Sequence, residues 1–281
     1  MNAIEITNLS KSYPGFSLQP FDLTLPQGSI LGLVGENGAG KSTTIKLLMN
    51  AIQRDSGEVR VLGVDNRDPA FRDVKDDIGV VLDEAYFPEL LTARRLEAVM
   101  ANTYRNWDNA CFQRFLHTLS LPADKAFKDF SRGMKMKLAI AVALSHRPRL
   151  LILDEATSGL DPMVRDEILD LFNDFTRDEG HSILLSSHIV SDLEKLCDYI
   201  AFIHNGRLLF CEEKDRLLEE YAIMRLSQRD YEALPPEAVK GVKQNSYGVE
   251  ALVLRRQVSP AFSAEHTTLE DIILFLAKGE H

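Results

Sequence analysis

A glycine-rich segment that ends in a lysine and two hydroxyl residues is the first part of this sequence with recognisable chemistry. Residues 35–43 read Gly-Glu-Asn-Gly-Ala-Gly-Lys-Ser-Thr and fit the pattern G-x-x-x-x-G-K-[ST]. They follow the apolar run 30–34 and precede a helix-compatible stretch at 44–49. In a strand–loop–helix context, successive backbone N–H groups converge on phosphate oxygens, and the helix N-terminus attracts the same anion. The segment therefore predicts a nucleoside triphosphate site.

The polar groups of this loop have distinct expected roles. Lys41 is expected to reach the β- and γ-phosphates, and the hydroxyl of Ser42 to bind Mg²⁺. The other loop residues expected to contact the nucleotide are Asn37, Gly38, Ala39, Gly40 and Thr43. The alternative is a glycine-rich turn that fits the pattern by chance, and the flanking strand and helix disfavour it.

An acidic pair follows a wholly apolar run further along the chain. Residues 150–153 are Leu-Leu-Ile-Leu, and Asp154 and Glu155 come directly after them. Such a run is typical of a buried parallel strand, whose C-terminal end opens onto the ligand crevice of an α/β sheet. Asp154 is placed there to bind Mg²⁺, and Glu155 to act as general base toward an attacking water. The alternative is a strand end followed by two solvated acids.

Three further motifs complete an ordered series with the loop and the acidic pair: Phe130-Ser-Arg-Gly-Met-Lys135, Ser158-Gly-Leu-Asp161 and Ser186-Ser-His188. This order resembles the ATP-binding cassette (ABC) family, which carries a phosphate loop, a signature motif, an Asp-Glu strand, a D-loop and a switch histidine. The resemblance covers about residues 4–217, most of the chain. It implies an ABC ATPase whose ligands are ATP and Mg²⁺.

The resemblance also implies roles for residues outside the phosphate loop. Tyr13 is expected to stack on adenine, His188 to contact the γ-phosphate, and Asp161 to organise the interface with a second cassette. The signature residues expected at the nucleotide of that second cassette are Ser131, Gly133 and Met134. Two cassettes must then pair head to tail, either as a homodimer or with a paralogous chain.

These residues also have purely structural interpretations. Tyr13 could be an ordinary turn aromatic, and Phe16 is a competing candidate for stacking on the base. Ser131 and Gly133 could be the N-cap and flexible start of a plain helix. Because helix-start chemistry also binds anions, that interpretation does not conflict with a phosphate contact. His188 could be one more histidine at the end of a strand.

The sequence departs from the family pattern in the signature and at the end of an earlier strand. The common signature is Leu-Ser-Gly-Gly-Gln, and here Arg132 and Met134 replace its first glycine and its glutamine. The family also carries a glutamine midway between the phosphate loop and the signature, where Asp83 now follows the run 78–82. A carboxylate can accept a hydrogen bond from water and bind Mg²⁺. We therefore expect Asp83 to be catalytic and metal-binding, although its charge opposes the γ-phosphate.

These departures resemble the bacterial ABC-2 type exporters. That branch includes the ATPases of bacitracin-type resistance pumps and of exporters of antimicrobial or cytolytic peptides. The resemblance implies a separate transmembrane permease as partner and export of a substrate such as a peptide or an antibiotic. The permease is expected in a groove near Asp83 with an apolar floor of Tyr86, Phe87, Leu90 and Leu91. The alternative for these four is ordinary packing.

Composition limits the partners and the compartment. Asp and Glu outnumber Lys and Arg by 42 to 32, a formal net charge of −10, which disfavours binding to nucleic acid. No apolar run approaches the ~20 residues of a membrane span, and the start of the chain does not resemble a signal peptide. The three cysteines lack C-x-x-C spacing, which suits reduced thiols. We expect a cytoplasmic protein, held peripherally on the inner face of the cell membrane through the permease.

Hydrophobic periodicity predicts an α/β fold, and the family resemblance implies a P-loop NTPase with a RecA-like core. An antiparallel β subdomain is expected near the N-terminus and an inserted helical subdomain at about 84–145. Beyond residue 221, two strands and a capped amphipathic helix at 268–277 predict a small C-terminal α+β appendage. The expected domains are 1–220 and 221–281.

Two other functional classes fit the sequence less well. A soluble ABC ATPase that acts on ribosomes or DNA usually has tandem cassettes, coiled-coil insertions or basic arms, and none is evident here. A GTPase or small kinase would leave Ser131, Asp161 and His188 unexplained, and the sequence has no N-K-x-D guanine motif. The predicted function is the ATPase subunit of an exporter.

Overall fold

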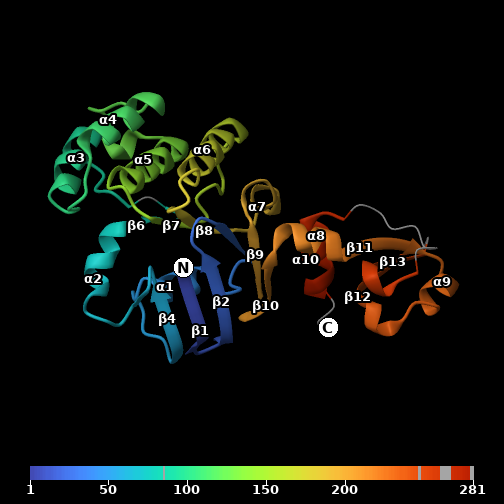
Figure 1. Ribbon diagram of the computed structural model, residues 1–281. Helices are drawn as coiled ribbons and strands as arrows, with labels where there is room; N and C mark the ends of the chain where they lie inside the picture. Colours follow the sequence, from blue (N-terminus) through green and yellow to red (C-terminus); the bar gives the residue numbers. More distant parts are fainter. Residues whose placement is uncertain (85, 246–247, 260–266, 279–281) are drawn as a thin grey trace.

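A mainly parallel sheet forms the centre of the molecule in the computed structural model (Figure 1). The structure describes residues 1–84, 86–245, 248–259 and 267–278. Within them the central sheet has the order β10-β9-β3-β8-β7-β6. Its strands are β3 Ile30–Val34, β6 Ile78–Val81, β7 Leu150–Asp154, β8 Ser182–Ser187, β9 Tyr199–His204 and β10 Arg207–Glu213. All neighbours pair in parallel except β9 and β10, so the carboxyl ends of β3, β6, β7 and β8 share one edge.

Both faces of this sheet are buried. In β3, Ile30 and Val34 belong to one hydrophobic cluster, whereas Leu31 and Leu33 belong to another. The strands β7 and β8 divide their apolar residues between the same two clusters. Because successive side chains of a strand point to opposite faces, strands covered on both sides are apolar at almost every position. This explains the uninterrupted apolar runs before the phosphate loop and before the acidic pair.

The first cover is an antiparallel sheet of order β2-β1-β4-β5. Its strands are β1 Asn2–Tyr13, β2 Phe16–Pro26, β4 Ser56–Val61 and β5 Val64–Asp65. The helix α1, Lys41–Leu48, buries Ile45, Leu47 and Leu48 in the same cluster as these strands. The helix that follows the phosphate loop is thus held between two sheets.

The second cover is helical and leads into a separate helical region at the top of Figure 1. The elements are α2 Phe71–Val74, η1 Lys75–Asp77, α3 Ala93–Ala101, α4 Asn109–Thr118, η2 Phe127–Asp129, α5 Arg132–Ser145, α6 Pro162–Phe175 and α7 Val190–Leu196. The helix α5 packs Ile140 against the central sheet and Leu138 against α3 and α4. Because α5 is covered on two sides, it is apolar almost all round.

The C-terminal part forms a sheet of order β11-β13-β12, to the right in Figure 1. Its elements are α8 Lys214–Glu220, β11 Tyr221–Leu226, α9 Gln228–Glu232, η3 Pro236–Ala238, β12 Val239–Asn245, β13 Gly248–Leu254, η4 Arg255–Gln257 and α10 Leu269–Lys278. The sequence does not predict β12, because Val-Lys-Gly-Val-Lys-Gln-Asn is mostly polar; pairing with β13 holds it in place. Leu252 and Ile272 share a hydrophobic cluster with the central sheet. Because this cluster contains residues from both sides of residue 220, the domain boundary expected there remains a prediction.

Throughout the described ranges, we find no helix that combines the length and the apolar character needed to cross a membrane.

A tight contact between β3 and α7 gives the first testable prediction. A Cβ atom on Gly32 would stand 2.9 Å from Sγ of Cys197 and 3.0 Å from Cδ2 of Leu193. Overpacking of a dense core is destabilising. Gly32→Ala should therefore lower the free energy of unfolding by about 1–3 kcal/mol, measured by urea denaturation.

The matched control is the double variant with Cys197→Ala, which removes the nearer obstructing atom. The loss in the double variant should be smaller than the sum of the two single losses, because the two sites touch. Strictly additive losses would show that this contact is not the cause.

Candidate functional site

The phosphate loop links the end of β3 to the start of α1. A Cβ on Gly35 would stand 2.3 Å from the carbonyl oxygen of Ile203, so only glycine fits against β9. Gly38 and Gly40 have φ angles of +84° and +121°, which side-chain-bearing residues rarely adopt. The hydroxyl of Thr44 donates to the carbonyl oxygen of Gly40 at 3.0 Å and fixes the first turn of the helix. The three glycines of the loop are thus needed for its shape.

The ammonium group of Lys41 lies at the centre of the site. It donates to the carbonyl oxygens of Gly35 at 2.7 Å and Glu36 at 3.3 Å. It also lies 3.2 Å from Oε1 of Glu155. That oxygen is buried and has no hydrogen-bond partner among the described residues, so its contact with Lys41 is an ion pair without hydrogen-bond geometry. The phosphate loop and the acidic pair are therefore in direct electrostatic contact.

Ser186 positions both members of the acidic pair. In the register of β7 and β8, Asp154 lies opposite Ser186. The Ser186 hydroxyl donates to Oδ1 of Asp154 at 2.5 Å, and its oxygen accepts from the Glu155 N–H at 3.1 Å. The Glu155 N–H also lies 3.1 Å from the Ser186 carbonyl oxygen. Sequence reasoning gave Ser186 no role; its position at the polar end of an apolar strand was the available signal.

Glu155 adopts an uncommon backbone conformation. Its φ angle is +51°, a left-handed geometry that costs a non-glycine residue about 1–2 kcal/mol. The bonds to Ser186 hold the chain in this turn. Its Oε2 lies 2.7 Å from Nδ1 of His188. Lys41, Glu155 and His188, which come from three separate segments, thus form one chain of contacts.

The signature residues lie at the N-terminus of α5. Ser131 is the N-cap of that helix, and its hydroxyl oxygen accepts from the N–H of Met134 at 3.2 Å. A Cβ on Gly133 would stand 3.4 Å from the side chain of Val164, near the start of α6. Among the hydrogen bonds of the described residues, none joins Ser131 to Lys41 or Glu155. The structure therefore does not bring the signature residues into the cluster around Lys41.

The D-loop packs against the signature. Asp161 is the N-cap of α6, and its Oδ1 accepts from the N–H of Val164 at 3.1 Å. A Cβ on Gly159 would stand 2.7 Å from Nη1 of Arg132, so the arginine that replaces the family's glycine lies directly against the D-loop. The sequence gives no signal for that contact, because only folding brings these segments together.

The aromatic residues before the phosphate loop differ in exposure. Tyr13, at the end of β1, is 42% exposed, and the ammonium of Lys11 lies 5.4 Å from its ring centroid. Phe16 packs partly against the core, 3.2 Å from the place of a Cβ on Gly40. Of the two candidates for base stacking, Tyr13 has the more accessible ring.

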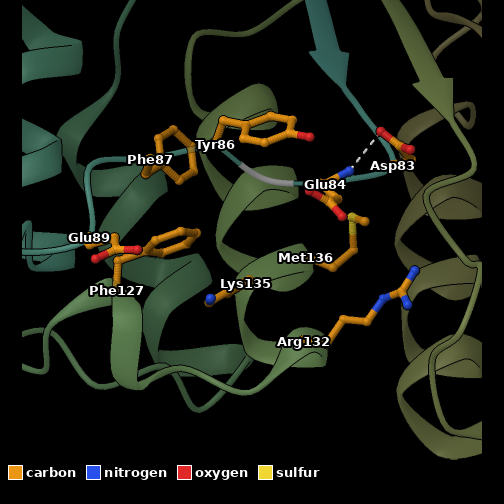
Figure 2. A pocket seen from close by; sticks show the side chains of 9 residues that line it. All are labelled: Asp83, Glu84, Tyr86, Phe87, Glu89, Phe127, Arg132, Lys135 and Met136. Atoms are coloured by element: carbon orange, nitrogen blue, oxygen red, sulfur yellow. Dashed lines mark hydrogen bonds between the residues drawn. The ribbon is translucent and has the colours of Figure 1, made fainter.

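Asp83 lies just beyond β6, at the same sheet edge as Asp154. Its Oδ1 accepts from the N–H of Glu84 at 2.9 Å, as drawn in Figure 2. The side chain is exposed and lines a cavity of about 480 Å³ together with Glu84, Tyr86, Phe87, Glu89, Phe127, Arg132, Lys135 and Met136. Asp83 and Arg132, two of the three positions that depart from the family pattern, thus border the same cavity.

The four residues of the predicted apolar floor separate into two kinds. Tyr86 and Leu90 are 74% and 70% exposed. Phe87 packs edge-to-face on Phe127, with ring centroids 5.4 Å apart, and Leu91 packs against the helical cluster. Of the four, Tyr86 and Phe87 line the cavity, whereas Leu90 and Leu91 do not.

The fold and this site define a P-loop NTPase: a parallel sheet with a glycine-rich loop before α1 and an acidic pair after β7. Residues 18–158 match the ABC transporter family model. The chain is 31% identical over 226 residues to the ABC transporter ATP-binding protein YtrB of Bacillus subtilis (strain 168), covering 80% of this chain and 76% of YtrB. The chain belongs to the ABC transporter family, and it is an ATP-binding and ATP-hydrolysing subunit.

Two further comparisons agree with this assignment. The bacitracin transport ATP-binding protein BcrA of Bacillus licheniformis is 36% identical over 209 residues, covering 73% of this chain and 68% of BcrA. A solved ATP-binding subunit of an ABC transporter superposes with a TM-score of 0.69 at 28% identity, covering 76% of this chain and 91% of that structure. The predicted family and fold class are confirmed.

The contact between Lys41 and Glu155 gives a prediction about nucleotide affinity. Glu155 competes with phosphate for the lysine, so Glu155→Gln should bind ADP more tightly, by about three- to ten-fold. Isothermal titration calorimetry with ADP measures this without relying on turnover.

His188→Ala serves as the control, because it leaves the pair of Lys41 and Glu155 in place. Its ADP affinity should change less than that of Glu155→Gln. Unchanged or weaker ADP binding by Glu155→Gln would show that the ion pair does not compete with the nucleotide.

Proposed function

We propose that this chain is the ATP-hydrolysing subunit of an exporter, which pairs head to tail on ATP and drives a separate transmembrane permease. The observation that supports this best is the convergence of Lys41, Glu155 and His188 at the edge where β3, β7 and β8 end. A base, a cation for phosphate and a histidine are then available at one nucleotide. The similarity to BcrA, described as a bacitracin transport ATP-binding protein, supports the transport role.

The residues at this edge suit ATP with Mg²⁺. Ser42 is exposed in the first turn of α1, and Asp154 is oriented by Ser186; hydroxyl and carboxylate oxygens are the ligands that Mg²⁺ prefers. Asp83, at the end of the neighbouring strand, is a further candidate ligand. Bound Mg²⁺ would neutralise charge on the phosphate oxygens. The loop residues proposed to bind the nucleotide are Asn37, Gly38, Ala39, Gly40, Lys41 and Thr43.

Arrival of the γ-phosphate would change the partner of Lys41. Its ammonium group would turn from Glu155 toward the phosphate, which carries more charge than the carboxylate. The released carboxylate of Glu155 would accept a proton from the attacking water as general base. His188 would keep Glu155 oriented by donating through Nδ1, and a hydrogen bond from its Nε2 to the phosphate would require protons on both ring nitrogens. In the conformation described here, Lys41 and Glu155 are paired with each other, so neither would be available for the reaction until the pair opens.

Pairing of two cassettes would complete the site. Ser131 and Gly133 lie at a helix N-terminus, where N–H groups and the helix dipole favour an anion. Because Ser131 has no hydrogen bond to the cluster around Lys41, we propose that it serves the nucleotide of a second copy or of a paralogous cassette. Asp161, which caps α6 beside the signature, would lie at that interface. ATP would then join two chains that both carry negative net charge.

The permease would dock at the cavity beside Asp83, with Tyr86 and Phe87 on its wall. A cytoplasmic helix of the permease fits this position, because movement of the adjacent strand end would reach it directly. The chain would then lie on the inner face of the cell membrane through its partner. The BcrA-like character favours a peptide or antibiotic cargo, whose contacts would lie in the permease.

The test of this function is Glu155→Gln beside the wild type. The wild-type chain should hydrolyse ATP. The variant should lose turnover by at least about 100-fold and accumulate as an ATP-dependent dimer in size-exclusion chromatography with light scattering, because nucleotide stays bound between the chains. Full turnover in the variant would overturn the role of Glu155, and a monomer at saturating ATP would overturn self-pairing.

Tyr13 provides a separate test of nucleotide binding. Stacking of a base on an aromatic ring is worth about 1–3 kcal/mol, so Tyr13→Ala should weaken ATP affinity about five- to 100-fold. Tyr13→Phe keeps the ring face and should bind nearly as the wild type does, measured by fluorescence titration of a labelled ATP. Equal affinities in all three proteins would remove Tyr13 from the site.

A further inference from the structure

The seven-residue helix α7 connects the C-terminal part of the chain to His188. We propose that the segment from Lys214 onward is a positioning element for His188: through α8 and α10 it holds α7, and α7 holds the histidine against Glu155. The inference rests on the proposed role of His188. It assigns to the C-terminal part a function in nucleotide turnover that neither its sequence nor its small sheet suggests by itself.

The first link is the short distance along the chain from His188 to α7. The strand β8 ends at Ser187, His188 follows, and α7 begins at Val190. The N–H of Ile189 donates to the hydroxyl oxygen of Ser187 at 3.0 Å and closes the turn between them. Because only Ile189 separates His188 from the start of α7, a displacement of α7 must move the histidine.

The second link is that α7 is too short to be a stable helix without its neighbours. Isolated helices of fewer than about 12 residues are marginal in water, and α7 has seven residues. Within the part of the chain that the structure describes, no side-chain hydrogen bond caps its N-terminus. Its position is therefore set by the elements that contact it.

The helix α6 holds the N-terminal turn of α7. Nε of Arg165 donates to Oδ1 of Asp192 at 2.6 Å, and Nη2 donates to the hydroxyl oxygen of Ser191 at 2.9 Å. Asp192 is 1% exposed, so this carboxylate depends on Arg165 for its charge compensation. Since α6 begins next to Asp161, the D-loop and His188 are connected through the same helix.

The helix α8 holds the other end of α7. Nζ of Lys214 donates to the carbonyl oxygen of Glu194 at 2.7 Å, and the N–H of Lys214 donates to the carbonyl oxygen of Asp198 at 2.8 Å. A cation near the last carbonyl groups of a helix is favourable. The helix α8 ends at Glu220, and β11 of the C-terminal sheet starts at the next residue. The C-terminal sheet is thus joined to α7 through Lys214.

The helix α10 adds to the support that the central sheet gives the apolar face of α7. Leu193 and Leu196 of α7 share one hydrophobic cluster with Leu269 and Ile272 of α10, and α10 packs on both α7 and α8. The same cluster contains Leu252 of β13. Figure 1 shows α7, α8 and α10 side by side between the central sheet and the C-terminal sheet. Because packed cores are dense, a shift of α10 would be transmitted to α7.

The test uses the full-length chain with Lys214→Met, which keeps the length of the side chain and removes its hydrogen bond to Glu194. We expect kcat for ATP to fall about three- to ten-fold, since small misplacements of catalytic groups are costly, with KM for ATP unchanged. The Cε1–H resonance of His188, assigned by its loss in His188→Gln, should shift in the NMR spectrum of histidine-labelled protein.

Four further variants separate positioning from general destabilisation. Lys240→Met makes the same charge change at an exposed site on β12 and should leave both kcat and the His188 resonance unchanged. Lys214→Arg should restore most of kcat, because it can still donate to Glu194. Ile272→Val, which trims the buried face of α10, should shift the His188 resonance, whereas Leu274→Ala, at a half-exposed site on the same helix, should not.

An unshifted His188 resonance in both Lys214→Met and Ile272→Val would overturn the proposal. Equal losses of kcat in Lys214→Met and Lys240→Met would also overturn it. These outcomes can be told apart from a failure of the proposed function. If His188→Gln itself keeps full turnover, the catalytic role of His188 is wrong, whereas the resonance shift still reports whether the C-terminal part positions the ring.

Discussion

The parallel pairing of β3, β8 and β7 is the constraint on which the rest of the structure depends. It brings the ends of three distant segments to one edge of the sheet: the phosphate loop that leads to Lys41 follows β3, Glu155 follows β7 and His188 follows β8. Parallel strands have to be buried on both faces, which the antiparallel sheet with α1 and the helices α5 to α7 provide. The burial that stabilises the fold therefore also assembles the site.

At this edge the ammonium group of Lys41 has two possible anionic partners, the carboxylate of Glu155 and a bound phosphate. In the present conformation Lys41 faces Glu155, and the carboxylate is held between that ammonium and His188. A triphosphate would offer Lys41 a larger negative charge. If Glu155 is the general base, as proposed, nucleotide binding would then release it from Lys41.

Two of the departures from the family pattern, Arg132 and Asp83, lie in the same region of the molecule. Arg132 lies against Gly159 of the D-loop and borders the cavity that Asp83 also lines (Figure 2). A negative charge at the end of β6 and a positive charge at the start of α5 thus occupy one region next to the proposed permease contact. The C-terminal part is connected to the site separately, because α8 and α10 contact α7, the helix that follows His188.

The sequence by itself determined the phosphate loop, the acidic pair and the family, because these depend on local residue order: glycines that allow positive φ angles, a lysine after the last of them, and apolar runs of strand length. It also predicted most strands and helices. It did not predict β12, whose mostly polar residues are held by pairing with β13. Nor did it predict the contacts of Ser186 with Asp154, of Arg132 with Gly159, or of Lys214 with α7. Only the tertiary structure decided these, because each joins residues that the chain separates and that sheet register or helix packing brings together.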